Sequence, residues 1–380
     1  VGAFSLSADG RVATICVDTA DYKGVRLPAR NLGTDIGRVT GTAADVSLSL
    51  SSERGAVVVG TIGRNRQIDE WAKQGKLDVS AIEGKWESYL IQTVDGNLVI
   101  AGSDKRGTIF GIYDLSEKIG VSPWHYFADV PAQRHAALYV KPGRYVQDSP
   151  KVKYRGIFLN DEWPSLGGWA SKKFGGFNSR FYAHVFELLL RLKANYMWPA
   201  MWAWSFYADD PENSKTAHDM GIIMGTSHHE PMARNHQEWA RKRKQYGVWD
   251  YATNQKVLDR FFREGIERVK DTEDLITIGM RGDGDAPMGG KEGADHEYVN
   301  RDEYNMNLLK KVIKNQRKII KDVTGRPADE RPQVWAIYKE VQRFYDMGLR
   351  VPDDVIMLLC DDNWGNVRRL PNAEERKRPG

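Results

Sequence analysis

The chain has 380 residues, of which 41% are hydrophobic and 28% are charged, a composition typical of a globular protein with room for two domains. Its 55 basic and 51 acidic side chains nearly balance, which argues against the strongly basic surface of a nucleic-acid-binding protein. The two cysteines exclude a disulfide scaffold and a four-cysteine zinc site, and no apolar run reaches the length of about 18 residues that a membrane span needs.

Short β-like runs alternate with helical patterns in the first 150 residues. The strand candidates are residues 12–17, 46–50, 56–60, 88–94 and 98–101, and the helix candidates are residues 67–74 and 106–119. Such alternation predicts a small α/β layer domain. A proline-punctuated stretch, SPWHYFADVPAQ, follows at residues 122–133, and we place the domain boundary near Pro150.

From residue 151 to residue 380, six apolar strand candidates recur, and each ends in polar residues. Amphipathic helix patterns separate them, at residues 179–193, 237–245, 254–270 and 303–323. This order predicts a (β/α)8 TIM-type barrel, whose active site lies at the carboxyl ends of the strands. A doubly wound open sheet is the alternative, but no glycine-rich phosphate-binding motif follows the first strand. Because only six strands precede Gly380, we expect the C-terminal part of the barrel to be missing from this chain.

The polar residues at the predicted strand ends are the candidate functional residues. In chain order they are Asn160, Asp161 and Glu162; Trp198; His228, His229 and Glu230; Arg281, Asp283 and Asp285; Tyr338, Lys339 and Glu340; and Asp361, Asp362, Asn363 and Trp364. Carboxylates that share a cleft raise each other's pKa, so one acts as an acid while another stays ionised, as glycoside hydrolysis requires. For any single carboxylate, a loop cap or a surface ion pair is the simpler explanation.

The stretch GIIMGTSHHEPM, residues 221–232, is compatible with a metal site, a sugar pocket or a structural turn. Adjacent residues of an extended strand point to opposite faces, so we expect His228 and His229 not to share one ion. The helical HExxH spacing of zinc enzymes is also absent. We therefore predict no catalytic metal and no cofactor, and favour hydrogen bonds from these histidines to substrate hydroxyls or to a neighbouring acid.

Two other side chains have both a functional and a structural interpretation. Arg281 could bind the carboxylate of an acidic substrate in bidentate fashion, or it could neutralise Asp283 or Asp285. Trp198 could stack on a sugar ring, or the tryptophans of YMWPAMWAW could be core residues with one exposed member.

Several long motifs, taken in order, resemble glycoside hydrolase family 115, the xylan α-1,2-glucuronidases: RGIFLNDEWP, LLLRLKANYMWPAMW, GIIMGTSHHEPM, ITIGMRGDGD and CDDNWGN. The N-terminal SDKRGTIFGIYDLSEKIGVSPWHYFADVP also looks like the first domain of that family, so the resemblance covers nearly the whole chain. It implies an inverting hydrolase without a metal in its chemistry. Carried over, Glu340 is the general acid and Asp285 the general base, although the choice between Asp283 and Asp285 stays open.

The resemblance also implies substrate contacts. Asn160 and Asp161 look like sugar-contacting residues, as do Tyr338 and Asn363, and Arg281 matches a motif near the pocket. To the candidate substrate-binding residues we add the other strand-end residues Trp198, His228, His229, Glu230, Asp283, Asp361 and Trp364.

The implied partners are glucuronoxylan and aldouronic oligosaccharides, without nucleic acid or membrane, and the full-length protein is expected to form a homodimer. A polymer too large to import favours an extracellular or periplasmic location, although no signal peptide is visible. Three alternatives remain. They are a non-catalytic carbohydrate-binding protein with the same pocket, a metal-dependent hydrolase, and a hexosaminidase-like retaining glycosidase that uses adjacent acids such as Asp161–Glu162 or Asp361–Asp362.

Overall fold

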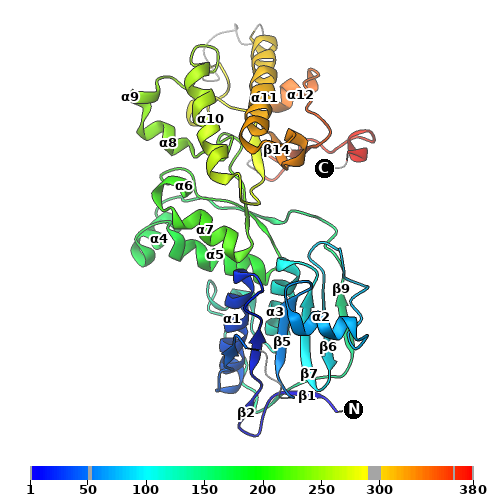
Figure 1. Ribbon diagram of the computed structural model, residues 1–380. Helices are drawn as coiled ribbons and strands as arrows, with labels where there is room; N and C mark the ends of the chain where they lie inside the picture. The colour runs from blue at the N-terminus through cyan, green and yellow to red at the C-terminus, as the bar shows by residue number, and fades with distance from the viewer. Residues whose placement is uncertain (1, 50–53, 290–300, 363, 379–380) are drawn as a thin grey trace. The chain divides into compact units, whose positions relative to one another are not determined.

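The computed structural model describes residues 2–49, 54–289, 301–362 and 364–378, shown in Figure 1. The chain forms two compact units. The first comprises Val1–Gly156, Arg180–Tyr196 and Lys215–Ile222, and the second comprises Ile157–Ser179, Met197–Ser214 and Ile223–Gly380. Contacts thus group two later segments with the N-terminal residues, and the division into domains near Pro150 stays a prediction.

A six-stranded sheet forms the centre of the first unit, in the order β4-β3-β5-β7-β6-β9. The strands β3, β4, β5 and β7 run parallel, whereas β6 is antiparallel to both of its neighbours. Their bounds are β3 (Ile15–Val17), β4 (Val46–Ser47), β5 (Val57–Thr61), β6 (Tyr89–Val94), β7 (Asn97–Gly102) and β9 (Arg144–Gln147). A smaller sheet contains β1 (Phe4–Ala8), β2 (Arg11–Val12) and β8 (Leu138–Val140), with β1 in the middle.

The three main helices of this unit are α1 (Lys23–Thr40), α2 (Arg66–Lys73) and α3 (Lys105–Lys118). Ile68 and Trp71 of α2 pack with Val58 of β5 in one fully buried apolar cluster. The sequence pattern predicts α2 and α3 but not α1, because Pro28 and three glycines interrupt the helical pattern of α1. One of these glycines is needed for packing, since a Cβ on Gly33 would lie 2.5 Å from the carbonyl oxygen of Ala44.

The six strands predicted after residue 151 are all present in the described residues. One three-stranded sheet has the order β10-β11-β12, and a parallel one has the order β13-β14-β15. The amide of Leu275, just before β13, donates to the carbonyl of Met224 in β12 at 2.9 Å, so the strands are linked in chain order. Their bounds are β10 (Gly156–Phe158), β11 (Tyr196–Trp198), β12 (Ile223–Met224), β13 (Ile276–Ile278), β14 (Gln333–Ile337) and β15 (Val355–Leu359).

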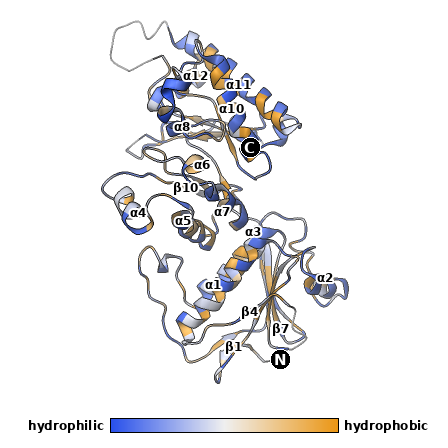
Figure 2. Ribbon diagram, turned by 60° about the vertical axis from the view of Figure 1, so that its left-hand side comes forward, coloured by the Kyte–Doolittle hydropathy of each residue, from blue (hydrophilic) through white to orange (hydrophobic). Residues whose placement is uncertain are grey.

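Helices connect successive strands, as the alternating pattern predicted. They are α4 (Leu166–Phe174), α5 (Ser179–Arg191), α6 (Phe206–Asp209), α7 (Glu212–Met220), α8 (His236–Arg241), α9 (Arg243–Tyr246), α10 (Gln255–Val269), α11 (Asp302–Thr324) and α12 (Glu340–Asp346). The predicted helix 237–245 is instead two short helices, since the backbone leaves the helical region at Lys242. Apolar stripes of α10 and α11 appear orange in Figure 2, in keeping with helices that bury one face.

The protein is therefore a mixed α/β protein. Among the described residues, none of the helices combines the length and the apolar character that a bilayer crossing demands.

Candidate active site

Arg281 connects the two carboxylates that the sequence singled out. Its Nε and Nη2 donate to the two oxygens of Glu340 at 3.1 and 2.7 Å, and its Nη1 forms an ion pair with Asp285. Arg281 and Glu340 are each only 1% exposed. One buried guanidinium therefore holds both candidate catalytic carboxyl groups.

Strand pairing explains why these residues meet. β13 and β14 are parallel neighbours, with Ile278 opposite Trp335, so the residues that follow them emerge at the same edge of the sheet. After β13 the chain makes a tight turn over Asp283–Asp285, in which Asp285 itself has φ 67°. This left-handed conformation is rare outside glycine, and it folds Asp285 back onto Arg281.

Both histidines of the HHE stretch approach the same carboxylate. The Nε2 of His228 lies 2.8 Å and the Nδ1 of His229 lies 3.8 Å from Oδ1 of Asp285. The expectation that the two rings point to opposite faces is wrong, because β12 ends at Met224 and the histidines lie in the turn that follows it. A turn does not alternate its side chains between two faces, so neighbouring rings can converge.

These groups also form a candidate set of metal ligands. Among the described residues, the ligand atoms of His228, His229 and Asp285 all lie within 4.8 Å of one another. Two imidazoles and a carboxylate suit several divalent ions. However, Arg281 already binds the same carboxylate, and its positive charge opposes a second cation there. The absence of a catalytic metal stays a prediction.

Burial and hydrogen bonding set the protonation of this cluster. Burial tends to raise the pKa of Asp285, but the hydrogen bond from His228 and the nearby positive charges outweigh it and hold that pKa below its usual value. Burial lowers the pKa of His229 to about 3, so this ring is neutral at physiological pH. Asp285 is consequently an ionised carboxylate that can accept a proton.

Asp283 lies in the same turn but belongs to a different ion pair. Its carboxylate forms an ion pair with Arg243 of α9 and lies 2.9 Å from Nε2 of His236. The hydrogen bond from Arg243 lowers the pKa of Asp283 more than burial raises it. Asp283 is therefore occupied by its own cation, whereas Asp285 belongs to the Arg281 cluster.

Glu230 is buried behind the histidines. It accepts hydrogen bonds from the amide of His236 at 2.9 Å and from Oγ of Ser227 at 3.2 Å, and this hydroxyl is also 3.2 Å from Nδ1 of His229. Burial raises the pKa of Glu230 to about 8, so the group is neutral at pH 7. Glu230 thus stabilises the turn that carries the histidines, instead of facing a ligand as the sequence suggested.

The first two strands supply an exposed aromatic ring. Trp198 is 8% exposed and packs edge-on against Phe158, so it is a core residue and not the expected sugar platform. Trp202, in contrast, is 45% exposed and stacks on the ring of His229 at 5.8 Å. The sequence had already suggested one exposed member of this run, without identifying it.

Asp161 fixes the loop that carries this ring. Its two oxygens accept the amides of Trp202 at 3.0 Å and Ala203 at 2.9 Å, and the residue is buried. Both oxygens thus accept a hydrogen bond within the protein, and the expected contact of Asp161 with sugar stays a prediction. Asn160 beside it is exposed.

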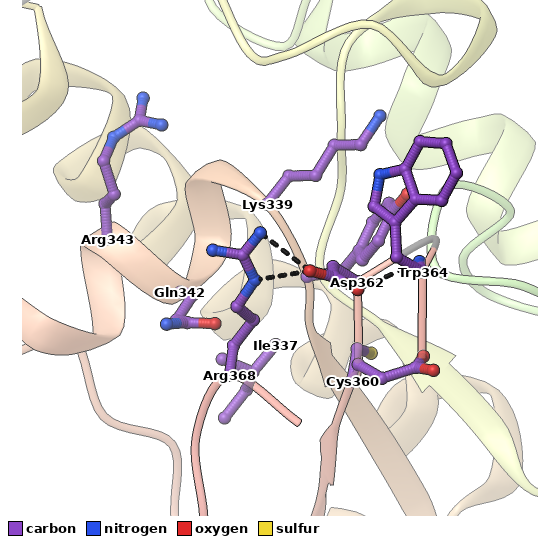
Figure 3. Close-up of a pocket in the computed structure, with 10 residues that line it drawn as sticks. Ile337, Lys339, Gln342, Arg343, Cys360, Asp362, Trp364 and Arg368 are labelled. Carbon is purple, nitrogen blue, oxygen red and sulfur yellow. Dashed lines mark hydrogen bonds and ion pairs between the residues drawn. The ribbon is translucent and has the colours of Figure 1, made fainter. Parts of the chain in front are cut away.

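Residues after β14 and β15 line a pocket of about 410 Å³, shown in Figure 3. Tyr338, Lys339, Asp361, Asp362 and Trp364 all contribute to its walls, and the Trp364 indole is exposed. Asp362 is bound to Arg368, as the dashed lines in Figure 3 indicate.

Tyr338 connects this pocket to the ion cluster. Its ring centroid lies 4.7 Å from that of His228, and the guanidinium carbon of Arg281 lies 5.4 Å from it. The structure thus brings together the residues expected after the third, fourth and fifth strands, and Tyr338 joins them to the pocket at the sixth. Asn363 lies outside the described residues.

Comparisons with known proteins show the family to which the chain belongs. The sequence model of Glycosyl hydrolase family 115 matches residues 147–380. The chain belongs to this family. A solved structure of the family is BtGH115A, a 4-O-methyl-α-glucuronidase with specificity for decorated arabinogalactans, which is 35% identical with a TM-score of 0.86. The match covers 99% of this chain and 48% of BtGH115A, so the chain spans about half the length of that relative.

More distant structures share the fold of this family 115 chain. A GH20 chitobiase of Flavobacterium johnsoniae is 12% identical with a TM-score of 0.56, over 97% of this chain and 54% of its own. A GH20 β-N-acetylhexosaminidase of Streptomyces coelicolor A3(2) is 10% identical with a TM-score of 0.56, over 99% of this chain and 69% of its own. A comparison with curated proteins finds no match. At these identities the GH20 enzymes are evidence for the fold alone.

Proposed function

We propose that this chain carries the catalytic acid and base of a glycoside hydrolase that removes α-1,2-linked (4-O-methyl-)D-glucuronic acid side chains from glucuronoxylan with inversion. The observation that supports this most directly is the pair of carboxyl groups on Arg281, Asp285 and Glu340, which come from neighbouring strand ends. An inverting enzyme needs two carboxyl groups separated by roughly 6.5–9.5 Å, with water between base and sugar.

Asp285 is the better candidate for the base. It is ionised, it is oriented by His228, and the competing Asp283 is bound to Arg243. Hydrogen bonding of this kind positions a carboxylate to accept a proton from water.

Glu340 is the candidate for the acid, and its surroundings set a requirement. Both of its oxygens accept hydrogen bonds from Arg281, whereas a general acid must direct one of its oxygens to the leaving group. The proposal therefore requires Arg281 to release Glu340 when substrate binds. Arg281 could then remain with Asp285, which keeps that carboxylate ionised.

Several broader features belong to the same proposal. The six strands are the first part of a (β/α)8 barrel, preceded by an N-terminal α/β domain over residues 1–150. The polymeric substrate places the enzyme outside the cytoplasm, and the full-length protein forms a homodimer. Because the related BtGH115A acts on decorated arabinogalactans, the polysaccharide backbone is the part of the substrate that needs a direct test.

Product analysis tests the reaction and the residues together. The purified protein is incubated with glucuronoxylan and, separately, with glucuronic-acid-decorated arabinogalactan, and the released sugar is followed by NMR. We expect the β-anomer of (4-O-methyl-)glucuronic acid to appear first, and Glu340→Gln and Asp285→Asn to release it at least about 100-fold more slowly. Binding of the polymer without release would favour a carbohydrate-binding protein, and the α-anomer as first product would favour a retaining enzyme.

A further inference from the structure

The turn over Asp283–Asp285, which carries the proposed base, has an unusual backbone. Two consecutive residues lie in the left-handed region, Gly284 at φ 63° and Asp285 at φ 67°. The amide of Gly282 closes the turn on the carbonyl of Ala286 at 2.8 Å. A backbone of this kind persists where the surrounding structure holds it. The direction of the Asp285 carboxylate therefore depends on contacts that reach the turn from other segments.

The side chain of His236, at the start of α8, contacts the middle of this turn. The amide of Gly284 donates to its Nε2 at 3.1 Å, and the same nitrogen lies 2.9 Å from Oδ1 of Asp283. One ring nitrogen thus faces two groups of the turn, a backbone donor and a carboxylate. Gly284 directly precedes Asp285, so this contact acts on the backbone that leads into the proposed base.

The ring of His236 is itself held in place. The residue is 5% exposed, and its ring packs edge-on against Trp249, with 5.1 Å between the centroids, and lies 5.6 Å from the ring of His229. Its backbone amide donates to Glu230 at 2.9 Å. Among the described residues, its Nδ1 has no hydrogen-bond partner. Burial of an unpaired ring nitrogen is unfavourable, so apolar packing alone does not account for a histidine at this position.

We infer that His236 is a positioning residue that holds the Asp283–Asp285 turn through Gly284 and thereby directs the carboxylate of Asp285, an inference that rests on the proposed function. His228 contacts that carboxylate itself at 2.8 Å, whereas His236 contacts the backbone before it. The segment after β12 thus fixes the proposed base at its side chain and at its backbone. Such precision matters because a displacement of about 1 Å can lower a catalytic rate about 100-fold.

Three substitutions at this position separate the hydrogen bond from the volume of the ring. In His236→Gln the side-chain oxygen still reaches the amide of Gly284. His236→Leu fills a similar volume without an acceptor, and His236→Asn is polar but too short. On glucuronoxylan, the Leu and Asn variants should lower kcat for uronic acid release roughly 10- to 100-fold and change KM less than about twofold, because the base is misplaced while binding is kept. The Gln variant should stay within about threefold of the wild-type kcat.

His218→Leu is the matched control. It removes a half-buried imidazole of the first unit, whose Nδ1 also has no hydrogen-bond partner among the described residues. Both kinetic constants should stay within about twofold of the wild type. If His236→Leu does not fold, the comparison of His236→Asn with His236→Gln carries the test. Equal kcat values in the folded variants at this position, or a higher KM at unchanged kcat, would overturn the inference and leave the proposed function intact.

Hydrogen exchange measures the contact without relying on the reaction. If the wild type releases no uronic acid, the proposed function fails, and exchange of the Gly284 amide, followed by NMR on protein labelled with 15N-glycine, decides the role of His236. Exchange at least about tenfold faster in His236→Asn, with protection close to the wild type in His236→Gln, would still uphold the hold on the turn. Equal exchange rates in the three proteins would overturn it.

Discussion

The first unit buries one carboxylate among cations, whereas the second unit buries one cation among carboxylates. In the first unit, Glu87 accepts hydrogen bonds from Arg106 at 2.7 Å, from Arg155 at 2.5 Å and from the side-chain amide of Asn195 at 2.8 Å. In the second unit, Arg281 donates to Glu340 and Asp285. The central residue of each cluster, Glu87 or Arg281, is almost completely buried, and both clusters join segments far apart in the chain.

The difference in charge balance separates a structural cluster from a reactive one. Around Glu87 the cations exceed the acids, and both carboxylate oxygens accept from a guanidinium group. Around Arg281 the acids exceed the cations, a histidine hydrogen-bonds to one of them, and Tyr338 connects the cluster to a pocket. The Arg281 cluster thus supplies the two carboxyl groups beside a pocket that acid–base glycoside hydrolysis requires.

The largest expected effect concerns the two aspartates of one turn. Asp285→Asn should lower the rate of uronic acid release about 1,000-fold, because the base is lost. Asp283→Asn, two residues away, should lower it less than about tenfold, because Asp283 pairs with Arg243 and His236 instead of Arg281. Rates on a common substrate measure both. A larger loss in Asp283→Asn than in Asp285→Asn would exchange their roles.

Removing the carboxylate of the first cluster should affect stability and not chemistry. Glu87→Ala removes the buried carboxylate that Arg106 and Arg155 share and should lower the free energy of unfolding by about 3–5 kcal/mol. Urea denaturation measures this, with the exposed Glu83→Ala as a control expected to stay within about 0.5 kcal/mol. The folded variant should keep the wild-type kcat, and a loss of kcat at unchanged stability would contradict the distinction between the clusters.

Glu230 should make stability depend on pH. Burial raises its pKa from 4.5 to about 8, so the folded protein keeps a proton that the unfolded chain releases above pH 4.5. The free energy of unfolding therefore falls as pH rises from about 4.5 to about 8.

Glu230→Gln keeps the acceptor oxygen but removes this titration. It should gain roughly 2–4 kcal/mol over the wild type between these pH values. Melting curves across the range test it, with the exposed Glu303→Gln as a control that should keep the wild-type slope. Parallel curves for Glu230→Gln and wild type would mean that Glu230 is ionised in the folded protein.

The smallest expected effect is that of the exposed ring beside His229. Trp202→Ala should raise KM about 2- to 10-fold with little change in kcat, as expected for the loss of one stacking contact. Trp124→Ala removes an exposed tryptophan of the first unit and should change neither constant. If kcat falls instead, Trp202 acts on the chemistry through His229.

Local pattern made much of the chain after residue 151 predictable. An apolar run followed by polar residues located all six strands, and long amphipathic stretches located α5, α10 and α11 within about two residues of their ends. Helix α1 escaped because its packing relies on close backbone approach at glycines, which weakens the pattern that predicts a helix.

The sequence by itself determined where the strands end, which residues follow them, and the family to which those motifs belong. The tertiary structure decided which side chains pair with one another and which are exposed. Arg281 reaches Glu340 across 59 residues and His228 reaches Asp285 across 57, and the choice of Trp202 over Trp198 as the exposed ring depends on a loop held by Asp161. Periodicity is a local property that a sequence displays directly. Ion pairs and exposure depend on which distant segments meet, and strand pairing and turn geometry fix that only in the folded chain.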